Sequence, residues 1–287
     1  MQEKPYLIHA LSPLHAGTGQ AADVIDLPIA RMRSTGIPIL PGSSVKGVLR
    51  DYYSNLEKDD EDHPKKVKAV FGPDTENASD HAGALVVGDA RLLALPVRSF
   101  KGTFAWVTSP LLLTLAKRDL GNDLAVPAIS GRRALVPAGC INKHSDNKVY
   151  LEDLDLPTIN DVGNKLQDWI VLLKNSLFPN DGVFSNRFLM VDDETMTFLW
   201  ETATQLDTRI RLDSKTRTVA KGALWTEESL PPETIMIGLM AADRSRGGIE
   251  MTPEEVLNFV LEDESALQFG GKGTVGRGRC RLVPVRR

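Results

Sequence analysis

The segment Gly270-Gly-Lys-Gly-Thr-Val-Gly-Arg-Gly278 separates two short apolar stretches near the end of the chain. The flanking residues 266–269 and 278–285 predict strands, so this region is expected to fold as strand, loop, strand. Its glycines satisfy G-x-G-x-x-G, but a dinucleotide site needs that motif between a strand and a helix. Only eleven residues follow Gly276, and they predict a strand. A Walker P-loop is excluded too, because glycine follows Gly-Lys and no helix comes next.

Two explanations of this glycine-rich loop remain open. Glycines let a backbone come close to a phosphate and present N–H groups to it. The flanking cations Lys272, Arg277 and Arg279 would then attract the same phosphate. The alternative is a flexible hairpin turn followed by a solvated basic tail.

Working outward from the loop, the rest of the chain predicts an α+β fold. The apolar run Tyr6–Leu11 predicts a buried first strand. A helix is expected to open at Gly42-Ser-Ser44, with a serine as its cap and Val45, Val48, Leu49 and Tyr52 at helical spacing. With strands near 84–97 and 234–240 and the C-terminal strand, these elements predict a ferredoxin-like split β-α-β palm.

Further elements follow from local patterns. Thr252-Pro-Glu-Glu255 combines an N-cap, a proline at the first helical position and a capping-box glutamate, and predicts a helix through Leu261. A second amphipathic helix is expected over Val162–Leu173, and the segment 104–115 fits helix or strand. Alternation over Asp207–Trp225 predicts an exposed β-hairpin. Residues 24–32 are expected to be extended, and residues 57–82 to form an irregular insertion outside the core.

Composition limits the class of protein. The chain has 287 residues, 42% hydrophobic and 25% charged, as in an ordinary globular protein, and we expect one decorated domain over residues 1–287. No apolar run reaches the roughly 20 residues that span a bilayer. Without a signal peptide and with two cysteines, the sequence predicts a cytoplasmic protein. The net charge is −4, yet residues 27–50 and 270–287 carry basic residues and no acid, which suits a polyanion.

The glycine-rich loop ahead of a C-terminal strand resembles the signature of the RAMP superfamily of CRISPR RNA-binding proteins. Three other segments resemble the backbone subunit of type III-B Cmr complexes. They are Tyr6-Leu-Ile-His-Ala-Leu-Ser-Pro-Leu-His-Ala-Gly-Thr-Gly19, then Asp26-Leu-Pro-Ile-Ala-Arg31 with Pro41-Gly-Ser-Ser-Val-Lys-Gly-Val-Leu-Arg50, and Thr216-Arg-Thr-Val-Ala-Lys-Gly-Ala-Leu-Trp-Thr-Glu-Glu-Ser-Leu-Pro231. These segments keep their order over nearly the whole chain, whereas residues 120–150 carry no matching motif.

The resemblance implies an RNA-recognition-motif-like palm with a projecting thumb, formed by a hairpin at about 205–230. It also implies the partners: a CRISPR guide RNA, single-stranded target RNA, other Cmr subunits and further copies of the chain. The copies would stack head to tail as a helical filament, through an interface that need not close. No membrane partner is implied.

The resemblance places RNA cleavage at Asp26. RNA carries its own nucleophile, the 2′-OH, and a carboxylate can remove its proton directly or hold a metal whose hydroxide does so. A single carboxylate suits Mg²⁺, with Mn²⁺ as the alternative. His15 matches a histidine near the same site and is an auxiliary candidate. Asp23, Glu227 and Glu228 are candidate assisting acids, with solvated surface positions as the alternative.

Guide binding is expected at three places. At the first helix, Ser43, Ser44, Lys46 and Arg50 would form a phosphate cradle, although a solvated helix face is the usual fate of such a group. In the hairpin the cations are Arg209, Arg211, Lys215, Arg217 and Lys221, with Ile210, Leu212, Val219 and Leu224 as apolar surface. In the glycine-rich loop the residues expected to bind RNA are Gly270, Gly271, Lys272, Gly273, Gly276 and Arg277.

Three alternatives to a catalytic type III-B backbone subunit stay open. The chain could be a guide-binding scaffold in which Asp26 only shapes its loop. It could be the related type III-A backbone, with other partners and a similar mechanism. It could also be a stand-alone endoribonuclease that processes the guide precursor.

Overall fold

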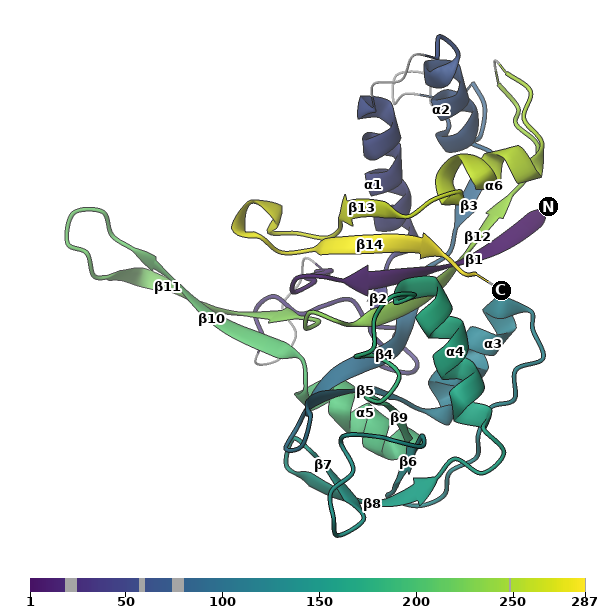
Figure 1. The fold of residues 1–287 in the computed structure, drawn as a ribbon. Helices are drawn as coiled ribbons and strands as arrows, with labels where there is room; N and C mark the ends of the chain where they lie inside the picture. Colours follow the sequence, from purple (N-terminus) through teal and green to yellow (C-terminus); the bar gives the residue numbers. More distant parts are fainter. Residues whose placement is uncertain (19–24, 57–59, 74–79, 248, 287) are drawn as a thin grey trace.

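The computed structural model describes residues 1–18, 25–56, 60–73, 80–247 and 249–286. In these residues the chain is a mixed α+β protein, built on a large sheet with helices on both faces (Figure 1). The sheet runs in the order β13-β14-β1-β12-β4-β5-β9-β6-β8-β7, with β2 on β4 and β3 on β12. Its strands are β1 (Gln2–Ala10), β2 (Ile39–Leu40), β3 (Leu85–Val87), β4 (Ala90–Ser99), β5 (Thr103–Thr108), β6 (Ala134–Val136), β7 (Lys148–Leu151), β8 (Leu154–Asn160), β9 (Phe188–Val191), β12 (Ile235–Ala242), β13 (Ser265–Gln268) and β14 (Arg279–Pro284).

Strand β1 is an internal strand of the sheet, and its residues from Pro5 to Ala10 are buried on both faces. It pairs antiparallel with β12 on one side and with β14 on the other. Tyr6 and Ile8 belong to one hydrophobic core, while Leu7 belongs to another on the opposite face. Side chains alternate between the faces of a strand, so a strand buried on both sides reads as a continuous apolar run. The prediction of a buried first strand is confirmed.

The first core lies under α1 (Gly42–Asn55), α2 (His63–Phe71) and α6 (Pro253–Leu261), which gather at the top of Figure 1. The capping box predicted at Thr252 is present. The Thr252 side chain accepts a hydrogen bond from the Glu255 N–H, and the Glu255 carboxylate accepts one from the Thr252 N–H. Serine does not cap α1, because Pro41 occupies the cap position without a side-chain hydrogen bond.

The second core lies under α3 (Pro110–Leu120) and α4 (Lys165–Leu177). Large aromatic side chains fill it, with Trp106 and Phe184 at a ring-centroid distance of 5.0 Å and Trp169 fully buried. The segment 104–115, for which the sequence left two possibilities, contains both: β5 ends at Thr108 and Ser109 caps α3. Part of the region without a motif, Ala134–Val136, pairs with β8 and β9 as β6.

A two-stranded hairpin, β10 (Gln205–Leu212) and β11 (Val219–Ser229), extends away from the body of the molecule at the left of Figure 1. It follows α5 (Asp193–Thr202) and confirms the hairpin predicted from the alternation. Its two faces differ. Leu206, Ile210 and Leu224 lie on one face and are each at least half exposed, while Arg209 pairs with Trp225 on the other.

The expectation for the insertion was wrong. The irregular insertion expected over 57–82 contains the helix α2, whose Val67, Val70 and Phe71 pack into the first core. Residues 57–59 and 74–79 of that range lie outside the described residues. The expectation of an extended segment near 24–32 agrees with bridges at alternate residues, Leu27, Ile29 and Arg31, although these residues form no regular strand and Val24 lies outside the described residues. None of the helices in the described residues combines the length and the hydropathy that crossing a membrane requires.

Candidate functional site at the base of the hairpin

Asp26 is bound to the base of the hairpin. The segment around it lies beside β11, where the Leu27 N–H donates to the Thr226 carbonyl at 3.1 Å and the Glu228 N–H donates to the Leu27 carbonyl at 3.0 Å. One carboxylate oxygen of Asp26, Oδ2, accepts hydrogen bonds from the Thr226 N–H at 2.8 Å and from the Thr226 hydroxyl at 3.1 Å. The other oxygen, Oδ1, accepts none from a described residue, and the Asp26 side chain is exposed. One carboxylate oxygen of Asp26, Oδ2, is therefore held by Thr226, and the other, Oδ1, is open to solvent or a ligand.

Glu228 fixes the same segment from inside the protein. Its side chain is buried, and its Oε2 accepts a hydrogen bond from the Ile29 N–H at 3.0 Å. Its Oε1 lies 2.5 Å from a guanidinium nitrogen of Arg31. This charge is paired and fully hydrogen-bonded, as a buried carboxylate must be. The solvated surface position, which was the alternative for Glu228, does not agree with this burial.

Glu227 is also buried, on the opposite face of β11. Its carboxylate accepts hydrogen bonds from Lys272 Nζ at 2.8 Å and from the Trp225 indole at 2.7 Å, with Arg209 Nε at 3.5 Å. Burial acts to raise the pKa of Glu227, but the bonds from Lys272 and Trp225 outweigh it and leave the pKa below its ordinary value. An ionised carboxylate with these partners links the hairpin to the glycine-rich loop, which argues against its use as a free assisting acid.

His15 lies between the hairpin base and the glycine-rich loop. It is 7% exposed, and its Nδ1 is 2.6 Å from the Glu228 carbonyl oxygen. A carbonyl only accepts hydrogen bonds, so Nδ1 is the donor in this contact and Nε2 is left without a part in it. The His15 carbonyl in turn accepts from the Gly271 N–H at 3.0 Å. His15 is thus a buried residue that connects the hairpin base to the glycine-rich loop, and its Nε2 is the ring nitrogen available for proton transfer.

The glycine-rich loop packs against the His15 backbone and contains a short 3₁₀ turn, Gly273–Val275. Gly270 has φ +71°, and a Cβ there would lie 2.3 Å from the His15 carbonyl oxygen. Only glycine fits such a position. Arg277 is 5% exposed and donates to Asp207 and to the Ser229 hydroxyl, both at 2.6 Å. Of the three cations singled out for phosphate, Arg277 therefore lies inside the protein, whereas Lys272 is partly exposed and Arg279 is exposed.

The residues expected at the first helix are not brought to the hairpin base by any contact of the described residues. Lys46 Nζ donates to the Leu85 carbonyl at 2.6 Å, and burial, followed by the nearby Arg50 charge, lowers the pKa of Lys46. Arg50 donates to the Pro73 carbonyl at 2.8 Å. Ser43 and Ser44 are exposed at the start of α1. The two cations thus brace α1, and the serines are accessible.

The outer hairpin carries most of the predicted cations. Arg211, Lys215 and Arg217 are exposed, and the tip is ordered by Asp213, which accepts from the N–H groups of Lys215 and Thr216. Asp23 and the side chain of Lys221 lie outside the described residues. Ile210, Leu212, Val219 and Leu224, expected as apolar surface, are all exposed by about half or more.

No three histidine, cysteine, aspartate or glutamate side chains meet in the described residues in a way that could hold a metal ion. Asp26 offers one open oxygen, and Glu227 and Glu228 are occupied. These residues fit a divalent ion only as Mg²⁺ often binds, through one carboxylate with water and substrate phosphate completing the shell. They do not form a cage for a resident metal.

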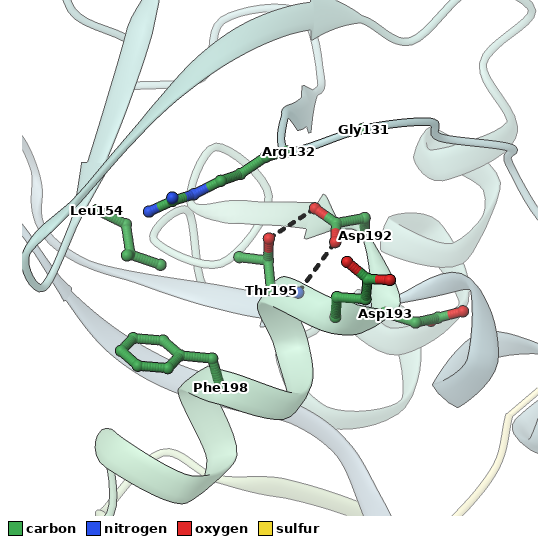
Figure 2. A pocket seen from close by; sticks show the side chains of 8 residues that line it. Gly131, Arg132, Leu154, Asp192, Asp193, Thr195 and Phe198 are labelled. Carbon is green, nitrogen blue, oxygen red and sulfur yellow. Dashed lines mark hydrogen bonds between the residues drawn. The ribbon is translucent and has the colours of Figure 1, made fainter.

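A pocket of about 760 Å³ lies elsewhere, at the start of α5, and contains none of the predicted site residues (Figure 2). Arg132 extends across it, opposite Phe198. Its Asp192 accepts hydrogen bonds from the Thr195 N–H at 2.9 Å and hydroxyl at 2.6 Å, as the cap of α5. This carboxylate is accounted for by helix capping, and the hairpin base remains the candidate site.

Sequence reasoning did not identify Thr226, Trp225 or Asp207 as site residues. Thr226 holds Asp26, Trp225 holds Glu227, and Asp207 pairs with Arg277. The first two lie inside the quoted segment 216–231, so the resemblance offered a signal for them. Asp207 had none, because its partner is 70 residues away.

Comparison with known proteins shows what the chain is similar to. The family model described as "RAMP superfamily" matches residues 7–281. The chain is 36% identical to the CRISPR system Cmr endoribonuclease Cmr4 of Pyrococcus furiosus, over 98% of this chain and 95% of that protein. The crystal structure of oligomeric Cmr4 from P. furiosus superposes on this chain with a TM-score of 0.76 at 29% sequence identity, and the match covers all of both chains. A subunit of a type III-B Cmr-beta complex bound to cognate target RNA shares the fold, with a TM-score of 0.77 at 22% identity over 99% and 98% of the two chains.

Proposed function

Because the chain belongs to the RAMP superfamily and is homologous to Cmr4 along its length, we propose that it is a backbone subunit of a type III-B Cmr complex. In this role it binds a CRISPR guide RNA in the cytoplasm and cleaves target RNA paired with that guide. The observation that carries the proposal is the placement of Asp26, whose open carboxylate oxygen lies at the base of a projecting basic hairpin.

The fold supports a finer interpretation. The order β14-β1-β12-β4, antiparallel throughout, with α1 and α6 as connections, is that of a ferredoxin-like or RNA-recognition-motif-like palm. The hairpin β10–β11 is then the thumb of a single RAMP domain spanning residues 1–287. Its exposed cations, Arg211, Lys215 and Arg217, would contact RNA phosphates, and the apolar face with Ile210 and Leu224 would contact unstacked bases.

Guide RNA would follow the accessible elements around the palm. Exposed Ser43 and Ser44 present the start of α1 to phosphate, and Lys272 presents the glycine-rich loop. Lys46 and Arg50 would contribute mainly by holding α1 in place, since both donate to backbone carbonyls. Other copies of the chain and other Cmr subunits would be arranged along the same guide, in a head-to-tail filament.

Cleavage would use the nucleophile of the target RNA. The open Oδ1 of Asp26 accepts the 2′-OH proton, and the 2′ oxygen attacks the adjacent phosphorus. The bond from phosphorus to the 5′ oxygen breaks, and that oxygen takes up a proton. The products are a 2′,3′-cyclic phosphate and a 5′-hydroxyl end. Thr226 keeps the Asp26 carboxylate oriented, and His15 has the proposed auxiliary role of relaying a proton through Nε2, the ring nitrogen that does not contact the Glu228 carbonyl.

Mg²⁺ is the proposed cofactor, with Mn²⁺ as the alternative. Asp26 is the residue that would hold the ion, and the ion would supply charge neutralisation at the phosphate and a more acidic bound water. The single open oxygen of Asp26 would either hold the ion or take the 2′-OH proton directly, while Thr226 orients the Asp26 carboxylate and Glu227 keeps Lys272 and the loop in place.

End-group analysis of the RNA tests this proposal. The complex should co-purify with mature guide RNA and should leave target fragments with 2′,3′-cyclic phosphate ends. A chain that cuts guide precursor as a monomer would instead be a processing endoribonuclease. A complex whose cleavage survives Asp26→Ala would make this chain a scaffold. A type III-A backbone would be revealed by the identity of the co-purifying subunits.

A further inference from the structure

A second feature suited to RNA lies on the part of the sheet formed by β4, β5 and β7, and the account of Asp26 does not use it. Phe100, on the turn between β4 and β5, is 81% exposed. Its ring centroid lies 6.3 Å from that of His144 and 6.2 Å from that of Tyr150, and the latter two lie 5.8 Å apart. We call Phe100, His144 and Tyr150 the aromatic platform.

The turn that carries Phe100 is held rigidly. The Phe100 N–H donates to the Tyr150 carbonyl at 3.1 Å. The Lys101 carbonyl accepts from the Ser99 hydroxyl at 2.9 Å and from the amide of Asn142 at 2.8 Å. Asn142 is fully buried, so it anchors the turn from beneath. A fixed turn that keeps a large apolar ring in water is preorganised to bind, because little conformational entropy is left to lose.

Charged side chains of both signs surround the platform. Lys148 is paired with Asp155, and Arg98 with Glu152. Asp146 is engaged by the Tyr150 hydroxyl at 2.5 Å and lies 3.2 Å from His144. Among the described residues no carboxylate pairs with the other two cations, Lys101 and Lys143.

A polar cavity adjoins the platform. It measures about 460 Å³, and Lys101, Lys143, His144, Asn147 and Asn160 are among the residues that line it. The two amides can each donate and accept hydrogen bonds. An exposed ring, two cations without carboxylate partners and a polar cavity thus occur together.

We propose that the aromatic platform binds an unpaired stretch of RNA. One base stacks on Phe100, while the neighbouring phosphates lie near Lys101 and Lys143. Stacking on an aromatic ring beside a basic groove is the general mode of single-strand binding and does not require a particular sequence. This inference rests on the proposed function for the identity of the ligand as RNA, but not on cleavage by Asp26.

The surroundings of Phe100 favour RNA over a protein partner. A protein interface has a core of several apolar side chains from which charge is depleted. Here Phe100 is the one large hydrophobic residue of the platform that is strongly exposed in the described structure, and lysines stand beside it. A single ring flanked by cations matches a base and its phosphates.

Fluorescence tests the proposal directly. Phe100→Trp places an indole on the platform, and Val162→Trp is the matched control because Val162 is 86% exposed on another loop. Titration with a short oligouridylate should quench the fluorescence of the Phe100→Trp protein beyond that of the wild type and of the control. Phe100→Ala should weaken oligouridylate binding at least about fivefold, the loss of one stacked base. Equal quenching in both tryptophan variants, with unchanged affinity in Phe100→Ala, would overturn the proposal.

Two further variants separate this inference from the proposed function. The quenching should persist when Asp26→Ala is added, so a failure of Asp26 to cleave would leave the platform result intact. It should also persist with Arg211→Ala and Arg217→Ala together, which weaken the hairpin route. If Phe100→Ala kept its affinity for RNA but lost a co-purifying protein subunit, the platform would be a protein-docking surface and the proposal would be wrong.

Discussion

Thr226 donates two hydrogen bonds to the same carboxylate oxygen of Asp26, one from its backbone N–H at 2.8 Å and one from its hydroxyl at 3.1 Å. The two residues are 200 positions apart in the chain. Their contact joins the N-terminal segment to the base of the projecting hairpin, near the end of β11. The position of the open oxygen therefore depends on how the hairpin is seated.

Replacing Thr226 with valine should slow target cleavage without weakening RNA binding. The change removes the bond that the hydroxyl donates to Asp26 Oδ2 and the one that it accepts from the Asp26 N–H at 3.2 Å, and it keeps the bond from the Thr226 N–H, so Asp26 loses part of its orientation. A single such bond is worth about 1 kcal/mol, which corresponds to roughly a fivefold to tenfold lower rate. Single-turnover cleavage by the assembled complex measures it. Thr208→Val is the matched control, because Thr208 is the cross-strand neighbour of Thr226 and does not contact Asp26. Equal rates in the two variants would contradict the role given to Thr226.

Glu227→Gln should destabilise the protein near neutral pH. The carboxylate is buried against Lys272 and Trp225, and its removal leaves the Lys272 and Arg209 charges without their partner. We expect a loss of about 1–3 kcal/mol in the free energy of unfolding.

The same variant should show a pH dependence of defined sign. The pKa of Glu227 is lowered in the folded protein, so its contribution is present above the ordinary glutamate pKa of about 4.3 and is lost as the pH falls through the lower folded value. Thermal unfolding of both proteins from pH 7 downward should give a difference in Tm that narrows below about pH 4.3. A difference that widened there would show that Glu227 is not ionised in the fold.

Arg277→Ala should loosen the hairpin from the glycine-rich loop. Its guanidinium is buried and binds Asp207 and Ser229, and breaking such a pair costs about 3 kcal/mol. Limited trypsin digestion should then cut β10 and β11 faster than in the wild type. Arg279→Ala is the control, since Arg279 is exposed two residues away. Unchanged digestion in Arg277→Ala would mean that the hairpin is seated by other contacts.

Gly270→Ala and Gly276→Ala separate crowding from backbone strain. Both glycines have positive φ, +71° and +83°, but only at Gly270 would a Cβ meet a neighbour, 2.3 Å from the His15 carbonyl oxygen. Backbone strain alone should lower the free energy of unfolding of the Gly276→Ala protein by about 1 kcal/mol. Gly270→Ala should cost clearly more and should also reduce cleavage, because His15 would move. Chemical denaturation measures both, and equal losses would refute the close approach of the loop to His15.

Parts of the fold followed from local signals in the sequence. The capping box at Thr252 predicts the helix that it begins, and the apolar run 6–11 predicts a strand buried on both faces. Helix α2 was missed because His63-Pro-Lys-Lys-Val-Lys68 is dominated by charge, and its apolar residues are buried only by packing under α1.

The site was predictable only in part. Asp26 and the glycine-rich loop were identified from resemblance, yet no local pattern reveals which acids end up buried. Glu227 and Glu228 look like solvated surface acids in the sequence. Their burial depends on Lys272 and Arg31, which the tertiary fold brings from distant parts of the chain. In the same way Arg277, which the sequence suggested for RNA binding, is paired with Asp207 inside the protein.

The central claim is that Asp26 takes the proton in target cleavage. Asp26→Asn keeps the shape of the side chain and leaves an oxygen to accept from Thr226, but it removes the base. The direct test is the single-turnover rate of target cleavage by the assembled complex carrying Asp26→Asn, with guide and target binding measured alongside. We predict binding within about twofold of the wild type and cleavage reduced by at least about 100-fold, the lower end of what general base catalysis contributes. Cleavage at the wild-type rate with normal binding would contradict the account.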